Sequence, residues 1–375
     1  MIYISLMPDI TLCTYTYNDA DLACALIASM PLWTLRPRRL LVVDDGSVPP
    51  FALPGDMDGM EAELLRLPDN QGPGKAKAAG LSRADTELIL SLDCDMRLAS
   101  GWLAGAVPQA LLPDVGIVSA PFVADAGPGV VGRWLKHFDA ERKPPGETDF
   151  LTGGIWLFRR EVWQDTGGFG DYVGRTHEDH HFCERVKRLG LRLLVLGEEA
   201  SQVRRLSRIA LAGRYRAWFG SNLRGGGRSR ETLAVSALHL TQTMIDHVAY
   251  ALRLNEPLFI YLEMLFFAVF GVACSEGLQD AQPGEALACS GALLLGLEQV
   301  CAPFPRLAAL LRHDLAVLGV TPPHEKTGQC PVWQAALDAL TALAQGGTFS
   351  RIEKFLPLLL EEEGDRADFS FYAVD

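Results

Sequence analysis

Over its first half, the chain alternates short apolar, β-branched runs with segments of helical periodicity. The runs typical of buried strands cover residues 10–15, 40–43, 63–67 and 87–92. Helical patterns lie between them, at residues 19–32 and 74–84. This alternation predicts an α/β domain built on a mostly parallel sheet. In such a sheet the ligand binds beyond the carboxyl ends of the strands.

The character of the sequence changes after Leu196. Residues 200–230 contain eight arginines and no acidic residue, and they include the run Gly225–Gly227. Beyond residue 231 the sequence is rich in Leu and Ala, with helical periodicity and few strand patterns. We therefore expect an α/β domain, a mobile Arg/Gly-rich loop that closes on a phosphate and a helical C-terminal domain. Their expected bounds are residues 1–205, 206–230 and 231–375.

The bulk properties exclude several classes of protein. A length of 375 residues suits two domains, and a net charge of −12 disfavours nucleic-acid binding. The eight cysteines are scattered without a C-x-x-C pair, as expected in a reducing compartment. The first residues lack the basic region of a signal peptide, so we expect a cytoplasmic protein.

One apolar stretch, residues 258–275, resembles a membrane span. Its uninterrupted apolar part covers only Met264–Cys274, whereas a bilayer requires ~20 residues. We expect a buried helix here. Peripheral contact with the inner face of a membrane remains an alternative.

The most informative motif is LILSLDCD at residues 88–95, an apolar strand that ends in two carboxylates. Asp93 and Asp95 are two positions apart, so their side chains share a face of the strand and can reach one cation. Carboxylate oxygens suit Mn²⁺ or Mg²⁺. The alternative for a single D-x-D is a pair of solvated acids at a strand end.

Four further motifs accompany the paired aspartates. They are DDGS at residues 44–47, NQGPGKAK at 70–77, LTGG at 151–154, and GGF at 167–169, which leads into HEDHHFCER at 177–185. The Gly-rich turn of residues 70–77 enters a helix and can offer backbone N–H groups and cations to a phosphate.

In this order, and with the strand-end sequence Thr16-Tyr17-Asn18, the motifs resemble the inverting family 2 glycosyltransferases. The resemblance covers residues 9–196 and does not extend to the helical part. It implies the glycosyltransferase-A fold, with a mixed, mostly parallel sheet. To this the chain adds a C-terminal all-α domain.

The resemblance implies a donor site at the ends of the first two strands. Tyr15 and Tyr17, with Asn18 nearby, would contact the nucleobase, and Asp45 would accept a hydrogen bond from it. Lys77 would lie near the donor phosphates. This position is more often arginine in the family.

It also implies a metal site and an acceptor side. Asp93 would contact the ribose or the metal, and Asp95 would ligate the metal, Mn²⁺ or Mg²⁺. On the acceptor side, the resemblance places Gly153, Gly154 and Glu178, and it makes Asp179 the catalytic base.

We therefore predict an inverting, metal-dependent hexosyltransferase that uses a nucleotide diphosphate sugar, by family frequency a UDP-sugar. The acceptor hydroxyl could belong to a saccharide, a lipid-linked molecule or a protein. The helical domain could form a homodimer, contact the acceptor or touch a membrane. The sequence does not choose between these.

Three departures and two rival functions accompany this prediction. His181 stands where the family often has an acid, and the later histidine that often supplies a third metal ligand is absent between His181 and His239. Leu206 replaces the tryptophan of a Q-x-x-R-W signature, which argues against a processive synthase.

One rival function is a non-catalytic binding or assembly subunit with a degenerate transferase domain. The other is a D-x-D phosphatase, whose strand should begin the chain.

Overall fold

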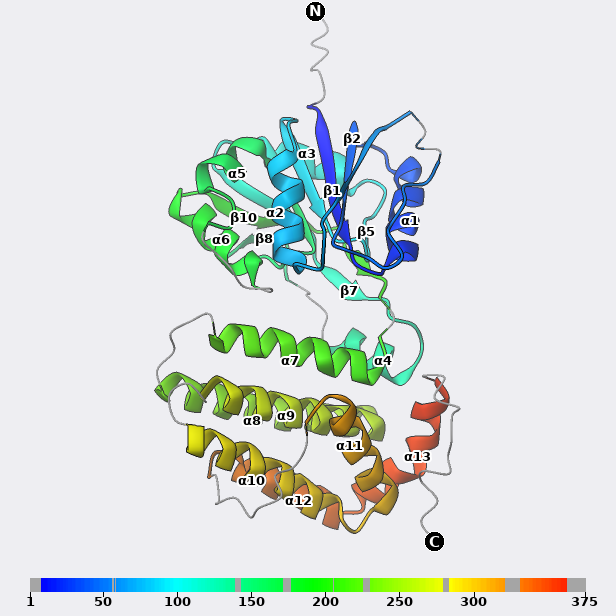
Figure 1. The fold of residues 1–375 in the computed structure, drawn as a ribbon, viewed down its shortest axis with the longest axis vertical. Coiled ribbons are helices and arrows are strands. Elements are labelled where there is room, and N and C mark those ends of the chain that lie inside the picture. The colour runs from blue at the N-terminus through cyan, green and yellow to red at the C-terminus, as the bar shows by residue number, and fades with distance from the viewer. Residues whose placement is uncertain are drawn as a thin grey trace, which may run out of the picture. The chain divides into compact units, whose positions relative to one another are not determined.

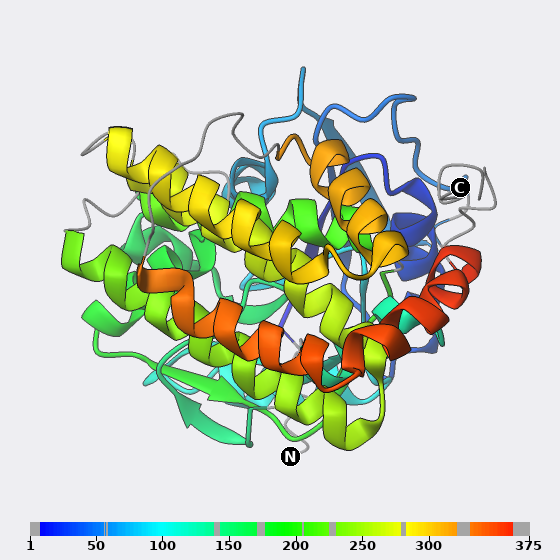
Figure 2. The same ribbon diagram turned by 90° about the horizontal axis from the view of Figure 1, so that it is seen from below.

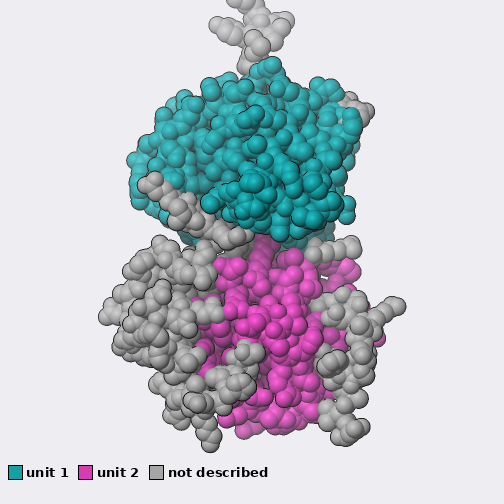
Figure 3. Space-filling view, in the orientation of Figure 1, with its two compact units in different colours: residues 1–125, 139–204 teal, residues 126–138, 205–375 magenta. Residues whose placement is uncertain are grey.

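The computed structural model describes most of the chain, in two compact units. The described residues are 8–55, 57, 59–138, 143–170, 177–204, 206–224, 230–278, 283–320 and 331–362. Figure 3 colours the two units: the first contains residues 1–125 and 139–204, and the second contains residues 126–138 and 205–375.

The first unit is built on an eight-stranded mixed sheet with the strand order β3-β2-β1-β4-β9-β6-β10-β8. The bounds are β1 (Ile10–Thr16), β2 (Arg39–Asp44), β3 (Glu61–Arg66), β4 (Leu88–Leu92), β6 (Val115–Ser119), β8 (Gly146–Thr148), β9 (Ile155–Arg159) and β10 (Arg192–Val195). Strands β1 to β4 run parallel, whereas β9 is antiparallel to both β4 and β6. The prediction of a mixed, mostly parallel sheet is confirmed.

A small second sheet lies in the same unit, with the order β5-β11-β7. Its strands are β5 (Met96–Arg97), β7 (Phe122–Ala124) and β11 (Ala200–Gln202). Strand β11 pairs antiparallel with β5, so that Gln202 lies opposite Met96. This pairing brings the end of the first unit next to the chain segment that carries the paired aspartates.

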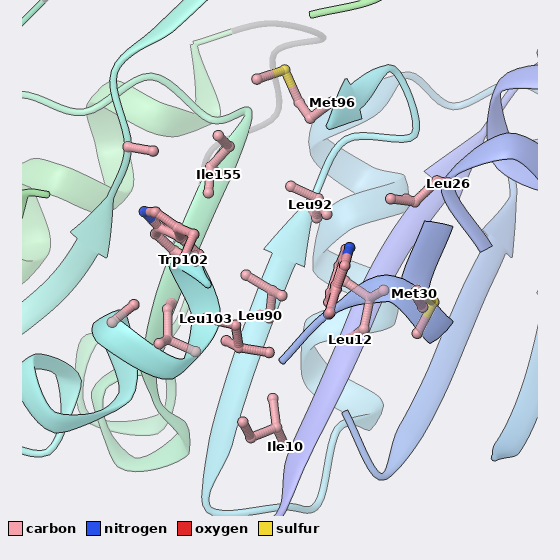
Figure 4. Close-up of a cluster of buried hydrophobic side chains, with 14 of the residues drawn as sticks. Ile10, Leu12, Leu26, Met30, Leu90, Leu92, Met96, Trp102, Leu103 and Ile155 are labelled. Carbon is pink, nitrogen blue, oxygen red and sulfur yellow. The ribbon is translucent and has the colours of Figure 1, made fainter. Parts of the chain in front are cut away.

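Helices cover both faces of the large sheet (Figure 1). On one face are α1 (Ala20–Ser29), with a 3₁₀ turn at Met30–Leu32, and α3 (Trp102–Ala110). On the other face are α2 (Pro73–Arg83), α5 (Arg160–Thr166) and α6 (Glu178–Arg188). Because side chains alternate along a strand, Leu12 and Leu90 enter the first core (Figure 4), whereas Cys13 and Ile89 enter the second.

The elements predicted over residues 10–92 all form, with bounds within two residues of the expected ones. Burial of both sheet faces explains why the central strands read as continuous apolar runs. The carboxyl ends of β1, β2 and β4 lie at one edge of the sheet, where the polar motifs were expected to gather.

The described elements of the second unit are all helices (Figures 1 and 2). Their bounds are α4 (Val130–Phe138), α7 (Arg208–Arg224), α8 (Arg230–Leu254), α9 (Pro257–Leu278), α10 (Pro283–Cys301), α11 (Pro305–Val317), α12 (Pro331–Gln345) and α13 (Thr348–Glu362). Helix α9 packs against α7, α8, α10 and α13 and is the core of the unit.

The prediction of a mobile loop over residues 206–230 is wrong for Arg208–Arg224, which form α7. The side chain of Arg208 is buried, and its guanidinium forms two hydrogen bonds with Asp314 of α11, at 2.6 and 2.9 Å. Tyr261 of α9 also donates to Asp314. Arg208 therefore pairs with a carboxylate of the protein itself, where the sequence predicted contact with a phosphate. The run Gly225–Gly227 lies outside the described residues.

The second unit also differs from the expected helical domain in its extent. It begins at residue 205 instead of 231, and it takes in α4 from the middle of the first unit's sequence. Two polar contacts hold α4 there. The Trp134 indole donates to Glu263 at 2.7 Å, and Arg133 pairs with Glu256 at 3.1 Å.

Helix α9 is longer than its apolar run suggested. Residues 257–274 have a mean hydropathy of 2.0, and among the described helices this one is long and apolar enough to span a membrane. In the structure, 89% of this segment is buried inside the protein. The core helix of a soluble protein passes the same test, so length and composition alone are weak evidence for a span.

Candidate active site

The turn after β2 is held together by the first aspartate of the DDGS motif. Asp44 is fully buried and accepts hydrogen bonds from the backbone N–H groups of Ser47 and Phe51, at 2.9 and 3.0 Å, and from Arg66. Burial by itself raises the pKa of Asp44, but these donors and Arg66 bring it below its ordinary value. Asp44 therefore stabilises the turn.

Asp45 joins this turn to the Gly-rich segment before α2. Its two oxygens accept hydrogen bonds from the backbone N–H groups of Gln71, at 2.8 Å, and Gly72, at 2.9 Å. Gly46 has a φ of +76°, and a Cβ there would lie 2.6 Å from the carbonyl carbon of Asp69. Only glycine fits at this position without moving the backbone.

The end of β1 is tied to the same turn. The backbone N–H of Asn18 donates to Ser47 at 2.9 Å, and the Asn18 side chain accepts from the N–H of Val48 at 2.8 Å. Tyr17 beside it is 42% exposed. Tyr17, Asn18 and Asp45 thus lie on two loops that are hydrogen-bonded to each other. Their contacts with a nucleobase stay predictions.

Lys77 is the centre of the polar cluster. Its ammonium donates to the carbonyl of Gly153 at 3.0 Å and to Glu178 at 2.9 Å, and it forms an ion pair with Asp93 at 3.2 Å. Burial alone would lower the pKa of Lys77, but Asp93 and Glu178 raise it well above its ordinary value. The ammonium thus has two hydrogen-bond acceptors and, in Asp93, a further negative charge beside it. The predicted contact of Lys77 with donor phosphates is not tested by this arrangement.

The position of Lys77 follows from α2. The buried residues of this helix recur at the spacing of one helical face, and Lys77 lies between Gly74 and Leu81 on it. Its ammonium lies 5.3 Å from the ring centroid of Tyr15 and 5.4 Å from that of Trp156. The buried ion pair of Lys77 was not predicted from the sequence, although a lysine on the apolar face of a helix is a signal that could have indicated it.

Gly153 leaves the space that Lys77 occupies. A Cβ at this position would lie 2.6 Å from the Lys77 ammonium and 3.3 Å from a Glu178 oxygen, whereas a Cβ at Gly154 would meet Met96 at an ordinary 3.6 Å. A Cβ at residue 153 would therefore displace the end of the Lys77 side chain from its ion pair. The proposed acceptor contact of both glycines stays a prediction.

Gly153→Ala is therefore expected to lower the free energy of unfolding by ~1–3 kcal/mol, because the added methyl displaces a buried ammonium. Gly154→Ala, on the adjacent residue, is the matched control and should change it by less than ~0.5 kcal/mol. Urea denaturation of both variants measures the difference. Equal effects would show that Lys77 does not depend on the space at Gly153.

Asp93, at the end of β4, shares the cluster. Its Oδ2 accepts a hydrogen bond from the Tyr15 hydroxyl at 3.3 Å, whereas its buried Oδ1 has no hydrogen-bond donor, only the ion pair with Lys77. Burial raises the pKa of Asp93 to about 6, with further contributions from Asp95 and Glu178, although Lys77 lowers it.

Asp95 is held by residues of and just after β11. Its Oδ2 accepts hydrogen bonds from Arg204 Nε at 2.9 Å and Gln202 Nε2 at 3.0 Å. Arg204 also donates to Asp19, at 2.7 Å, which precedes α1. The carboxylate that was predicted as a direct metal ligand thus has a cationic partner in the protein.

Asp179 lies in the first turn of α6, directly after Glu178. Its Oδ1 accepts a hydrogen bond from the N–H of His180 at 2.8 Å. Burial and the neighbouring Glu178 raise the pKa of Asp179, and Lys77 partly offsets them. Lys77 therefore links the strand end that carries Asp93 to the helix start that carries Asp179.

The residues of this cluster fit a divalent cation in their chemistry. Asp93 and Asp95 supply carboxylate oxygens, and the buried Oδ1 of Asp93 lacks a hydrogen-bond donor. Within the described ranges, no group of three His, Cys, Asp or Glu side chains is arranged to hold a metal. Two protein ligands suffice for Mg²⁺ or Mn²⁺ where phosphate oxygens and water complete the shell.

The family follows from residues 11–167, which match the model of "Glycosyl transferase family 2". These residues form a family 2 glycosyltransferase domain. The match includes the strand-end motifs, both aspartates of D-x-D and Gly153. This match includes the D-x-D strand end and gives no support to a D-x-D phosphatase.

Two curated relatives are also glycosyltransferases. The "Pre-mycofactocin glycosyltransferase" of Mycobacterium tuberculosis is 29% identical over 196 residues. The match covers 49% of this chain and 40% of the relative. An "N-acetylglucosaminyltransferase" of Rhizobium leguminosarum bv. trifolii is 29% identical over 133 residues, 32% of this chain and 70% of the relative. The match to the mycobacterial relative thus spans only 40% of that protein's length.

Solved structures show a more distant likeness. The mannosyltransferase PcManGT from Pyrobaculum calidifontis, in complex with GDP-Man and Mn²⁺, is 18% identical, with 91% of this chain and 88% of that chain covered and a TM-score of 0.42. TarS from S. aureus in complex with UDP-GlcNAc is 16% identical, covers 90% and 91%, and has a TM-score of 0.43. These scores are too low to carry an argument.

The structure brings together five of the eleven residues that the resemblance assigns to the site. Tyr15, Lys77, Asp93, Gly153 and Glu178 are in contact around one ammonium group. Sequence reasoning missed the residues that hold Asp95. Gln202 begins the incomplete Q-x-x-R-W signature, Arg204 lies at one of its unspecified positions, and no local pattern marks Asp19 as the partner of Arg204.

Proposed function

We propose that the chain transfers a hexose with inversion from a nucleotide diphosphate sugar, by preference a UDP-sugar, to an acceptor hydroxyl. The observation that carries this proposal is the cluster around Lys77, which joins Asp93 of the D-x-D strand end to Glu178 and the adjacent Asp179. A family 2 domain and two curated glycosyltransferase relatives support the same class of reaction.

The donor base is assigned to the loops after β1 and β2. The exposed ring of Tyr17 is available for stacking. Asp45 is assigned to accept a hydrogen bond from the base, and its bonds to the backbone of Gln71 and Gly72 fix its position.

Asp179 is assigned as the general base. The acceptor oxygen attacks the anomeric carbon while its proton passes to the Asp179 carboxylate, and the bond from that carbon to the phosphate oxygen breaks. The nucleoside diphosphate leaves with the electron pair, and a single displacement inverts the anomeric centre. The raised pKa of Asp179 makes it a stronger base than an ordinary aspartate.

Asp93 and Asp95 would hold Mn²⁺ or Mg²⁺. A divalent cation at this place neutralises the negative charge that collects on the departing diphosphate. Lys77 keeps its pairs with Asp93 and Glu178 and so orients both sides of the site. The identity of the acceptor is left to experiment, and a cytoplasmic site of action is part of the proposal.

A panel of nucleotide sugars, each with and without Mn²⁺, tests the proposal by thermal shift. We expect a UDP-sugar with Mn²⁺ to raise the melting temperature most, since a ligand at a hundred times its Kd adds ~2.7 kcal/mol of stability. CMP-linked and nucleotide-free sugars serve as controls. If no nucleotide sugar stabilises the chain under any condition, the donor assignment is wrong.

One observation favours a second candidate, a binding or assembly subunit that retains the domain without catalysis. One oxygen of Asp95, Oδ2, is already engaged by Arg204 and Gln202. Such a subunit would bind a donor and transfer nothing. Substitution of Asp179 separates the two candidates.

A further inference from the structure

The two aspartates of the D-x-D motif are each part of a separate triad of charges. In one triad, Lys77 lies between Asp93 and Glu178, at 3.2 and 2.9 Å. In the other, which we call the Arg204 triad, Arg204 lies between Asp95 and Asp19, at 2.9 and 2.7 Å.

The two triads together carry an excess of negative charge. Each triad contains two carboxylates and one cation, so with all groups ionised each carries a net charge of about −1 and the two together about −2. One divalent cation between Asp93 and Asp95 would balance this charge. Lys77 would then neutralise Glu178, and Arg204 would neutralise Asp19.

We propose that Arg204 is a displaceable counter-ion of Asp95. It neutralises this carboxylate while no divalent cation is bound, and it releases Asp95 but keeps Asp19 when the cation arrives. The inference rests on the proposed function in one respect, the use of Asp93 and Asp95 as cation ligands.

Burial explains why Asp95 needs a partner before a cation binds. Its side chain is only 5% exposed, and a buried carboxylate without a counter-charge is costly. The Arg204 side chain is 29% exposed, so it is less enclosed than the Asp95 carboxylate. The partner that can leave is therefore the more exposed of the two.

Competition follows from the shared atom. Arg204 Nε and Gln202 Nε2 both donate to Oδ2 of Asp95. A cation ligated by this oxygen at ~2.0–2.2 Å would lie close to the guanidinium, and like charges repel strongly where water is excluded. Gln202 is neutral and has no such conflict.

The backbone beside Arg204 is hydrogen-bonded to the segment that carries Asp95. Gln202 is paired with Met96 in the β5–β11 ladder, and the N–H of Val203 donates to the carbonyl of Asp95 at 2.7 Å. Asp19 supplies a second carboxylate for the Nη2 end of the same guanidinium. Release of Asp95 thus requires a rotation of the side chain and no movement of the strand.

Arg204→Gln tests the proposal through direct binding of Mn²⁺ to the full chain, measured by calorimetry or by the loss of the free-ion EPR signal. We expect the variant to bind Mn²⁺ at least about tenfold more tightly than the wild type, or 1.4 kcal/mol, because the competing cation is gone. A gain in affinity is not the result of a damaged fold.

Arg97→Gln is the matched control. Arg97 lies in β5, two residues after Asp95, and its guanidinium donates to the backbone carbonyls of Cys94, Met96 and Leu22. Its removal takes away the same charge from the same turn without freeing a carboxylate, so Mn²⁺ affinity should change less than about twofold. Asp95→Asn should weaken Mn²⁺ binding in both backgrounds.

The proposal is overturned if Arg204→Gln binds Mn²⁺ no more tightly than the wild type, or if Arg97→Gln gains as much affinity. Absence of Mn²⁺ binding in every variant overturns it as well. The proposed function is judged separately, by transfer. If Arg204→Gln gains affinity for Mn²⁺ while no nucleotide sugar is ever consumed, the counter-ion role stands and the transferase assignment fails.

Discussion

Asp179→Asn is expected to lower kcat for sugar transfer by ~10²–10⁴-fold and to leave the affinity for the donor unchanged. The amide has the shape of the carboxylate but cannot accept the proton of the acceptor hydroxyl. Asp179 lies one residue from the buried Glu178, whose contact with Lys77 keeps the start of α6 in place. Initial rates and donor titrations, with the nucleotide sugar found by thermal shift, measure the two quantities.

Glu184→Gln is the control for this prediction. Glu184 lies on the same helix, is exposed and pairs with Lys187 at 2.7 Å, so its loss should leave the rate unchanged. A transfer rate that survives Asp179→Asn would remove Asp179 as the base. A wild-type chain that binds the donor yet transfers to no hydroxyl acceptor would identify a binding subunit instead of an enzyme.

Lys77→Met is expected to lower the free energy of unfolding by ~3–5 kcal/mol, because it leaves buried carboxylates without their cation. Glu178 is 6% exposed, and Asp93 already has its pKa raised to about 6 by burial with Lys77 present. Removal of the ammonium raises the cost of keeping both ionised. Urea denaturation followed by tryptophan fluorescence measures the loss, since Trp156 lies beside the ammonium.

Two comparisons isolate the ion pair from the loss of a lysine. Lys75→Met, on the exposed face of α2, should change stability by less than ~0.5 kcal/mol. The double variant Lys77→Met with Glu178→Gln removes both partners of the 2.9 Å pair and should recover part of the loss, which a double-mutant cycle quantifies. Equal effects of the two lysine variants would show that Lys77 is not the centre of the site.

The described part of the α/β unit could largely be predicted from local patterns. The strand of residues 10–16 and the helix of residues 73–83 follow from apolar periodicity and turn chemistry, both properties of short segments. The motifs at strand ends also predicted which residues would gather at one edge of the sheet. That prediction needs only the rule that parallel strands present their carboxyl ends together.

The partners of the charged side chains could not be predicted in this way. In the sequence, Arg204 and Arg208 are two members of one arginine-rich segment, and nothing near them indicates their partners. In the structure, Arg204 lies between Asp19 and Asp95, and Arg208 is buried against Asp314. These pairs join residues that are about a hundred or more positions apart along the chain.

The sequence by itself determined the strands and helices of residues 10–92 and the edge of the sheet where polar groups meet, because local periodicity and backbone geometry set these features. Only the tertiary structure decided that Lys77 pairs with two carboxylates, that Gly153 lies against the Lys77 ammonium and that Arg204 pairs with Asp95. The physical reason is that a buried charge is stable only beside its counter-charge, and the fold alone determines which distant residue supplies it.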